Sequence, residues 1–258
     1  MTQKRRDIGI IASVAAEAEI IKGMLAGNNG GRLPFSAGRL NRKNIVLAIS
    51  GMGKTNAAHA AAVLALKHKP SIIINMGIGG AYPSSDLKIG DIAIAEKEIY
   101  GDEGVILEDG FHETELIGIP LLTKGRKRYF NEFPLDSRLV SKAFKSVLPI
   151  THHPASGGPA VVGPSPITVR KGPFLTLSTC TGTNKRAAEL EKRYGAICEN
   201  MEGAAIAHVC SIHDIPFMEV RGISNIVGKR DLRKWNIELA AANCQKAVLQ
   251  FLGSEVAE

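Results

Sequence analysis

The stretch CENMEGAAIAHVC, residues 198–210, joins the two features that decide how the chain folds. Its second half is rich in Ala, Ile and Val and has the composition of a helix packed into a core. Its first half holds two carboxylates, Glu199 and Glu202, although charged residues are rarely buried without a partner. The stretch therefore predicts a buried strand followed by a buried helix, with Glu202 at the junction between them.

The same succession of strand and helix recurs along the chain. Apolar runs typical of strands occupy residues 8–14, 45–50, 72–76, 92–95, 175–178, 196–198 and 217–220. Helical patterns occupy residues 55–69, 184–194, 202–213 and 234–252. Several strand runs are continuously apolar, which indicates strands covered by helices on both faces. This pattern predicts an α/β fold, a three-layer α/β/α sandwich with a central mixed β-sheet.

The composition is that of an ordinary globular protein. Of 258 residues, 45% are hydrophobic and 22% are charged, so the chain can bury a full core. This length suits one large α/β domain or two small ones, and we expect a single domain over residues 1–258. Residues 151–172 are rich in Pro and Gly, which indicates either a long surface loop or a lid or subunit-contact loop.

The cysteines and the basic charge bear on location and partners. Cys180, Cys198, Cys210 and Cys244 lack metal-site spacing, which favours reduced thiols in a cytoplasmic protein with no metal or cofactor. No apolar run approaches the ~18 residues of a membrane span. The net charge of +7 is compatible with a nucleic-acid binder, but aromatic residues make up only 5% and no stacking platform is visible. We favour a basic surface that attracts an anionic small substrate.

Two glycine-rich segments follow predicted strands. AISGMGKT, residues 48–55, departs from a P-loop at its first position, where Ala48 replaces Gly, so we expect no ATP site there. Its backbone N–H groups could still bind an anion at the start of a helix. INMGIGGAY, residues 74–82, predicts a tight turn in which Gly77, Gly79 and Gly80 allow a flat or sugar-like ligand to come close.

Charged side chains follow three of the predicted strands. Glu17 and Glu202 each lie between an apolar strand and a helix, and Arg221 lies at the end of another strand. Either carboxylate alone would be explained by the dipole of a helix N-terminus. Because ligands of α/β proteins bind at the carboxyl edge of the sheet, the three together predict a polar site in an apolar pocket.

The sequence resembles a known family, the nucleoside phosphorylase and nucleosidase superfamily. IGIIASVAAEAE, SGMGKTNAA, INMGIGGAY with LKIGDI, ENMEGAAIAHVC and VRGISN stand in the family's order. Within it the chain is similar to the branch of 5′-methylthioadenosine/S-adenosylhomocysteine nucleosidases and futalosine hydrolases. The run GISNIVGKRDLRKW, residues 222–235, is most similar to the futalosine hydrolases, which serve an alternative menaquinone pathway.

The resemblance assigns roles to particular residues. It implies that Glu202 accepts hydrogen bonds from the ribose hydroxyls, that Met201 packs against the sugar and that Gly80 borders it. It further implies that Glu17 deprotonates an attacking water, which Arg221 helps to orient. The base pocket would be built around Thr181, Thr183 and Asn225. Such carboxylates suit the oxocarbenium-like transition state of N-glycosidic cleavage.

In two respects the sequence differs from other branches of the family, and these differences bear on the nucleophile and on the purine that is released. The phosphorylases hold phosphate with arginines near the first loop and the glycine-rich segment, where this chain has neither Arg nor Lys, so water is the expected nucleophile. The nucleosidases that act on 6-aminopurines carry Asp at the position of Asn225. An amide cannot act as a Brønsted acid but can donate to a 6-oxo group, which favours hypoxanthine over adenine.

The resemblance and these differences together imply a metal-free hydrolase with futalosine as its leading substrate, releasing hypoxanthine and dehypoxanthine futalosine. The alternative within the class is 5′-methylthioadenosine/S-adenosylhomocysteine nucleosidase. From a different class, the chain could be a non-catalytic nucleoside- or nucleic-acid-binding protein, although the presence of both Glu17 and Glu202 speaks against that. Because family members usually pair to complete each other's sites, the resemblance also implies a homodimer or higher homo-oligomer.

Overall fold

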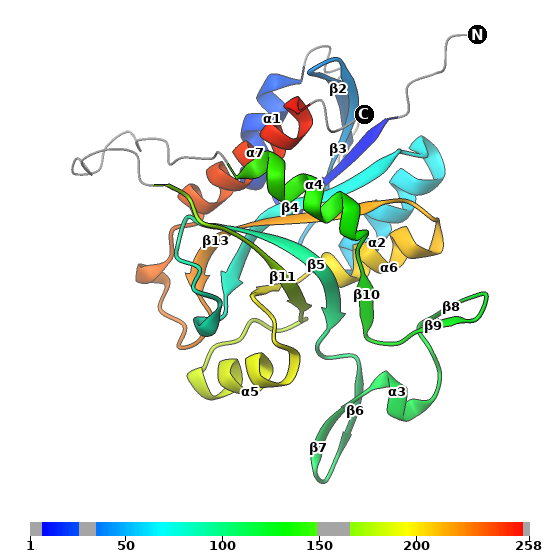
Figure 1. The fold of residues 1–258 in the computed structure, drawn as a ribbon, viewed down its shortest axis with the longest axis vertical. Coiled ribbons are helices and arrows are strands. Elements are labelled where there is room, and N and C mark those ends of the chain that lie inside the picture. Colours follow the sequence, from blue (N-terminus) through cyan, green and yellow to red (C-terminus); the bar gives the residue numbers. More distant parts are fainter. Residues whose placement is uncertain (1–6, 26–34, 149–165, 255–258) are drawn as a thin grey trace.

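The computed structural model describes residues 7–25, 35–148 and 166–254. Within these residues a nine-stranded mixed sheet runs through the molecule in the order β10-β5-β11-β12-β4-β1-β3-β2, with β13 paired to β4 and β5 (Figure 1). Its strands are β1 (Ile8–Ala12), β2 (Phe35–Leu40), β3 (Lys43–Ile49), β4 (Ile72–Ala81), β5 (Ile92–Tyr100), β10 (Glu132–Pro134), β11 (Val169–Thr176), β12 (Cys198–Asn200) and β13 (Phe217–Ile226).

Part of this sheet closes on itself. Strand β13 pairs in parallel with β4 and antiparallel with β5, while β5 is joined to β4 through β11 and β12. The strands β5, β11, β12, β4 and β13 therefore form a closed ring, and β10 and β1 continue the sheet outward from it. Closure brings residues from distant parts of the sequence to the same strand ends.

Helices cover both faces of the sheet, which confirms the predicted three layers (Figure 1). Helices α1 (Glu19–Met24), α4 (Ser137–Val147) and α7 (Ile237–Gly253) lie on one face, and α2 (Lys54–Val63) and α6 (Gly203–Ile212) lie on the other. Each face has its own apolar core, one built largely around β1, β4 and α7, the other around α2 and α6. In the described residues, no helix is long and apolar enough to cross a membrane.

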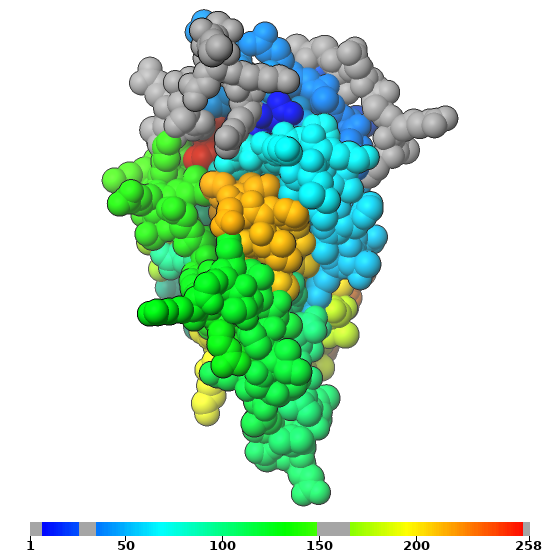
Figure 2. Space-filling view, turned by 90° about the vertical axis from the view of Figure 1, so that its right-hand side faces the viewer, coloured from blue at the N-terminus to red at the C-terminus, as the bar shows by residue number. Residues whose placement is uncertain are grey.

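A separate segment projects from the body of the protein. It consists of β6 (Gly104–Leu107), β7 (Gly110–Glu113), α3 (Thr114–Ile117), β8 (Leu122–Lys124) and β9 (Lys127–Tyr129). We call β6, β7 and α3, with the residues to Ile119, the arm. Figure 2 shows the arm as the tapering green end of the molecule. Its apolar side chains are exposed, with Ile106 at 80% and Ile119 at 70% of their full accessibility.

The structure corrects two sequence-based expectations. The glycine-rich segment of residues 74–82 is not a turn: β4 continues through it to Ala81, and none of Gly77, Gly79 or Gly80 has a positive φ. The Pro/Gly-rich loop predicted for residues 151–172 ends earlier, because β11 begins at Val169, and its residues 151–165 lie outside the described residues. The helix predicted for residues 184–194 is confirmed as α5 (Asn184–Tyr194), which ends at Gly195 with φ 57°.

Candidate active site

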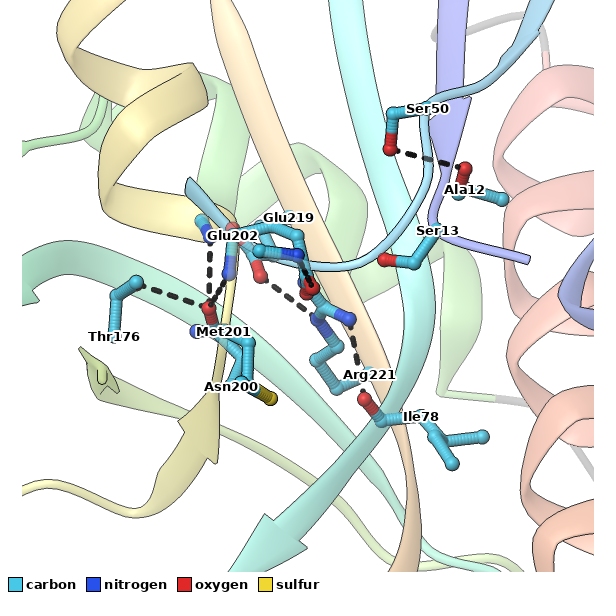
Figure 3. Close-up of polar contacts among 12 residues, drawn as sticks. Ala12, Ser13, Ser50, Ile78, Thr176, Asn200, Met201, Glu202, Glu219 and Arg221 are labelled. Carbon is cyan, nitrogen blue, oxygen red and sulfur yellow. Dashed lines mark hydrogen bonds and ion pairs between the residues drawn. The ribbon is translucent and has the colours of Figure 1, made fainter. Parts of the chain in front are cut away.

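Glu17, Glu202 and Arg221 meet at one end of the sheet, as predicted from the sequence. Glu17 follows β1 and Glu202 follows β12. Arg221 was predicted at the end of a strand but lies in the middle of β13, which continues to Ile226 beside β4. All three are buried, and Arg221 is only 1% exposed. Its Nη2 lies 3.3 Å from Oε2 of Glu202, and Figure 3 shows the guanidinium pointing between the carboxylates of Glu202 and Glu219.

Backbone N–H groups fix the carboxylate of Glu17. Its Oε2 accepts hydrogen bonds from the amides of Ser13 at 3.0 Å and Val14 at 3.2 Å, and its Oε1 accepts one from Ile78 at 2.8 Å. Burial raises the pKa of Glu17 above its usual value, and this outweighs the lowering by Arg221 and by the backbone donors. A buried carboxylate with a raised pKa is a stronger base, which suits proton removal from a water molecule.

The glycine at position 77 provides the space for this cluster. A Cβ atom built on Gly77 would lie 2.5 Å from Oε1 of Glu17 and 2.9 Å from Nη1 of Arg221. Any larger residue would therefore displace either the carboxylate or the guanidinium. This close approach, rather than a turn, is the reason for glycine at this point of β4.

Arg221 is held at three points by different elements. Its Nε donates to Oε1 of Glu219 at 2.8 Å, its Nη1 donates to the carbonyl of Ile78 at 3.1 Å, and its Nη2 reaches Glu202. Burial disfavours its charge, but the carboxylates of Glu219, Glu202 and Glu17 outweigh burial and leave the pKa of Arg221 above its usual value. The sequence analysis did not find Glu219, because it lies inside an apolar strand.

The P-loop-like segment of residues 48–55 binds the carboxylate of Glu202 and not a phosphate. The amide of Gly53, which has φ 95°, donates to Oε1 of Glu202 at 3.0 Å. Lys54, at the position of a P-loop lysine, pairs instead with Asp102 and with Glu103 at 2.9 Å. The anion that the Gly53 amide binds is therefore a side chain of the protein itself.

Asn225 and Gly80 lie side by side on paired strands. They are register partners across β13 and β4, and Nδ2 of Asn225 lies 3.2 Å from the position of a Cβ on Gly80. The hydroxyl of Ser224 has two acceptors, Oδ1 of Asn225 at 2.8 Å and the carbonyl of Gly79 at 3.2 Å. Donation to the nearer one, Asn225, leaves Nδ2 of Asn225 as the group available to donate.

The loop after β11, predicted to border the base, is fixed by Glu199. Oε1 and Oε2 of Glu199 accept hydrogen bonds from the amide of Thr181 at 2.9 Å and its hydroxyl at 2.5 Å, and Oε2 also accepts from the hydroxyl of Tyr82 at 3.0 Å. The sequence analysis assigned no role to Glu199, whereas the structure shows that it holds this loop in place. Thr183 caps α5 by accepting from the amide of Arg186, so its side chain has a structural contact.

Met201 links this loop to the strand ends. Its Sδ lies 3.6 Å from Sγ of Cys180, and it directly precedes Glu202. The loop that carries Thr181 therefore touches the turn that carries the buried carboxylate. The roles of Thr181, Thr183, Met201, Gly80 and Asn225 in substrate binding stay predictions.

Comparison with known proteins identifies the fold's family. Residues 7–253 match the Phosphorylase superfamily, which is nearly the whole chain. The chain belongs to this family. It is 32% identical over 206 residues to the futalosine hydrolase of Thermus thermophilus, covering 80% of each protein.

Methylthioadenosine nucleosidases are similar over more of the chain. The 5′-methylthioadenosine/S-adenosylhomocysteine nucleosidase of Maridesulfovibrio salexigens is 29% identical over 252 residues, 95% of this chain and 98% of the relative. The solved structure of the nucleosidase of Colwellia psychrerythraea, in complex with adenine, has a TM-score of 0.76 at 26% identity and covers 98% of this chain and 97% of its own. These comparisons support the predicted nucleoside phosphorylase-like fold.

Proposed function

We propose that the protein hydrolyses futalosine and releases hypoxanthine. The general reaction, cleavage of the N-glycosidic bond of a purine nucleoside, is that of the nucleosidases to which the chain is similar over most of its length. The structural observation that supports this activity is the convergence of Glu17 and Glu202 on the buried Arg221. In this mechanism Glu17 takes a proton from water, the resulting hydroxide bonds to C1′ as the bond to the base breaks, and the base leaves with the bonding electrons. Glu202 binds the ribose hydroxyls, and its charge favours the cationic sugar.

Water is the proposed nucleophile because a phosphate dianion would meet carboxylates here. Arg221 already faces Glu202, Glu219 and Glu17, and Lys54 is paired with Asp102. The turn of residues 13–17 and the glycine-rich part of β4 contain no cation. A phosphate bound beside Glu17 would lack a partner and be repelled.

The choice of hypoxanthine rests on Asn225. With Oδ1 of Asn225 accepting from Ser224, its Nδ2 is free to donate to a 6-oxo group or to N7 of a purine. The 32% identity to a futalosine hydrolase supports the same substrate. The second candidate is 5′-methylthioadenosine/S-adenosylhomocysteine nucleosidase, which the longer alignment to such an enzyme favours.

One experiment separates these candidates. Purified protein is incubated with futalosine, methylthioadenosine and inosine, with and without phosphate, and the free base is measured by chromatography. We expect hypoxanthine from futalosine at a rate independent of phosphate. Adenine release from methylthioadenosine at a higher kcat/KM would assign the second function, and a sugar 1-phosphate would overturn hydrolysis itself.

We also propose that two copies of the chain associate through the arm. Ile106, Leu107, Leu116, Ile117 and Ile119 are each 48–80% exposed on a projection that packs little against its own core. Exposed apolar surface that is larger than a few scattered side chains marks protein interfaces. Light scattering of the purified protein should give twice the mass of one chain, and replacement of Ile106 and Ile119 by Asp should give one.

A further inference from the structure

A second pair of buried carboxyl groups lies behind Arg221. Glu98 on β5 and Glu219 on β13 are both 0% exposed, although they are far apart in the sequence. Neither belongs to a recognisable motif, and the hydrolysis described above uses neither as a substrate contact. Two buried acids inside strands of the central sheet require a physical explanation.

The two carboxyl groups converge beneath the start of α6. A Cβ built on Gly203 would collide with both Oε2 of Glu219 and Oε1 of Glu98, so these two oxygens lie around the same point. Oε1 of Glu219 accepts from Nε of Arg221 at 2.8 Å, whereas Oε2 has no donor among the described residues. Two carboxylates this close cannot both be ionised, and a proton between them supplies the missing donor.

The surroundings place this proton on Glu98. Glu219 is the member that faces the guanidinium, so its charge is the one that is compensated. Burial, followed by the charge of Glu219, raises the pKa of Glu98 well above its usual value. Asn75, Thr176 and Cys198 contribute only neutral groups to this region from β4, β11 and β12, and the pKa of the Cys198 thiol is also raised by burial.

Glu98 also reaches the turn that carries Glu202. It accepts hydrogen bonds from Oγ1 of Thr176 at 2.7 Å and Nδ2 of Asn200 at 3.1 Å. Oδ1 of Asn200 in turn accepts from the amides of Glu202 at 3.0 Å and Gly203 at 2.7 Å, contacts that Figure 3 shows beside Thr176. Glu98 is therefore connected to Glu202 through Asn200 and to Arg221 through Glu219.

We propose that Glu98 is a positioning residue for the catalytic centre. As a neutral acid it donates to Glu219, which holds Arg221, and it accepts from Asn200, which fixes the turn of Glu202. The inference rests on nucleoside hydrolysis as the activity, but not on which nucleoside is cleaved. Without the proton, four buried carboxylates would surround a single arginine, and the guanidinium would be pulled away from Glu202.

Kinetics of two variants test this role. Glu98→Gln keeps a neutral group that can donate to Glu219 and accept from Asn200, so we expect kcat within a few-fold of wild type. Glu98→Val removes both contacts, and loss of a buried hydrogen bond to a charged group should lower kcat roughly 10–100-fold with a smaller change in KM. Glu96→Gln is the matched control, because Glu96 lies on the same strand but pairs with Lys171 at the surface.

The protonation state is measured without substrate. Carboxyl ¹³C NMR of glutamate-labelled protein at neutral pH should show a protonated signal that is absent from Glu98→Gln. An ionised Glu98 signal overturns the proposal, as does equal loss of kcat in the Gln and Val variants or wild-type kcat in the Val variant. If Glu98→Val does not fold, the NMR signal and the Gln variant decide. If no nucleoside is cleaved, the proposed function fails while the NMR result still stands.

Discussion

A single methyl group added at position 77 should disable the enzyme by displacing Glu17, the proposed general base. In Gly77→Ala the new Cβ would lie 2.5 Å from Oε1 of Glu17, whereas a carbon and an oxygen pack at about 3.3 Å. The carboxylate must therefore shift by nearly 1 Å, a displacement of the size that costs on the order of a hundredfold in rate. Because Ile78 donates to the same oxygen at 2.8 Å, the shift also weakens a hydrogen bond.

The expected loss of kcat in Gly77→Ala is therefore about a hundredfold, with the fold retained. Overpacking of a buried site costs about 1–3 kcal/mol, which corresponds to roughly 2–12 °C in Tm for a chain of this size. The assay is steady-state kinetics with thermal unfolding by circular dichroism. Gly23→Ala is the control, because a Cβ there meets nothing within 4 Å, and it should leave kcat unchanged. Wild-type kcat in a folded Gly77→Ala protein would refute the argument.

Three further predictions concern the carboxylates of Glu17 and Glu202, the pH dependence of activity and the choice of purine. Glu17→Gln and Glu202→Gln should each remove most of kcat while substrate still binds, measured by kinetics and calorimetry; near-normal kcat in either would exclude that residue from the chemistry. Because the pKa of Glu17 is raised, activity should fall as pH is lowered through a range above that of an exposed glutamate, and a pH profile of kcat/KM whose acid limb lies at the ordinary glutamate value would contradict this. Asn225→Asp should move the ratio of kcat/KM for futalosine and aminodeoxyfutalosine towards the amino compound by roughly tenfold to a hundredfold; an unchanged ratio would show that Asn225 does not read the base.

Much of the fold follows from local patterns in the sequence. Continuous apolar runs predict the central strands, and the Ala-rich and Leu-containing segments between them predict α2, α5, α6 and α7, because burial on both faces leaves a strong compositional signal. The arm and α4 were not predicted. Each strand of the arm has four residues, none of them buried, so they lack the apolar run by which buried strands are recognised.

The candidate site was predictable only in part. Glu17, Glu202 and Arg221 each follow an apolar run of the sequence, so their proximity was expected from the layout of an α/β sheet, although β13 continues past Arg221 to Ile226. Glu219 lies inside the apolar run that begins β13, and Glu98 lies in the charged stretch Glu96-Lys97-Glu98 of β5, so neither was singled out. The pairing of β13 with β5 brings these two strands together. Gly77 was predicted to lie in a turn. The sequence alone does not distinguish a glycine required by the backbone conformation from one required by the close approach of a neighbouring side chain.

The closed ring of strands also sets the order in which this protein can be completed during synthesis. Strand β13, residues 217–226, bonds to β4 and β5, which leave the ribosome more than a hundred residues earlier. Contacts of such long sequence separation form slowly and late, after local helices and hairpins. Until β13 is inserted, Glu17 and Glu202 have no guanidinium to balance their charges, so a nascent chain ending before residue 217 should expose its sheet and bind chaperones.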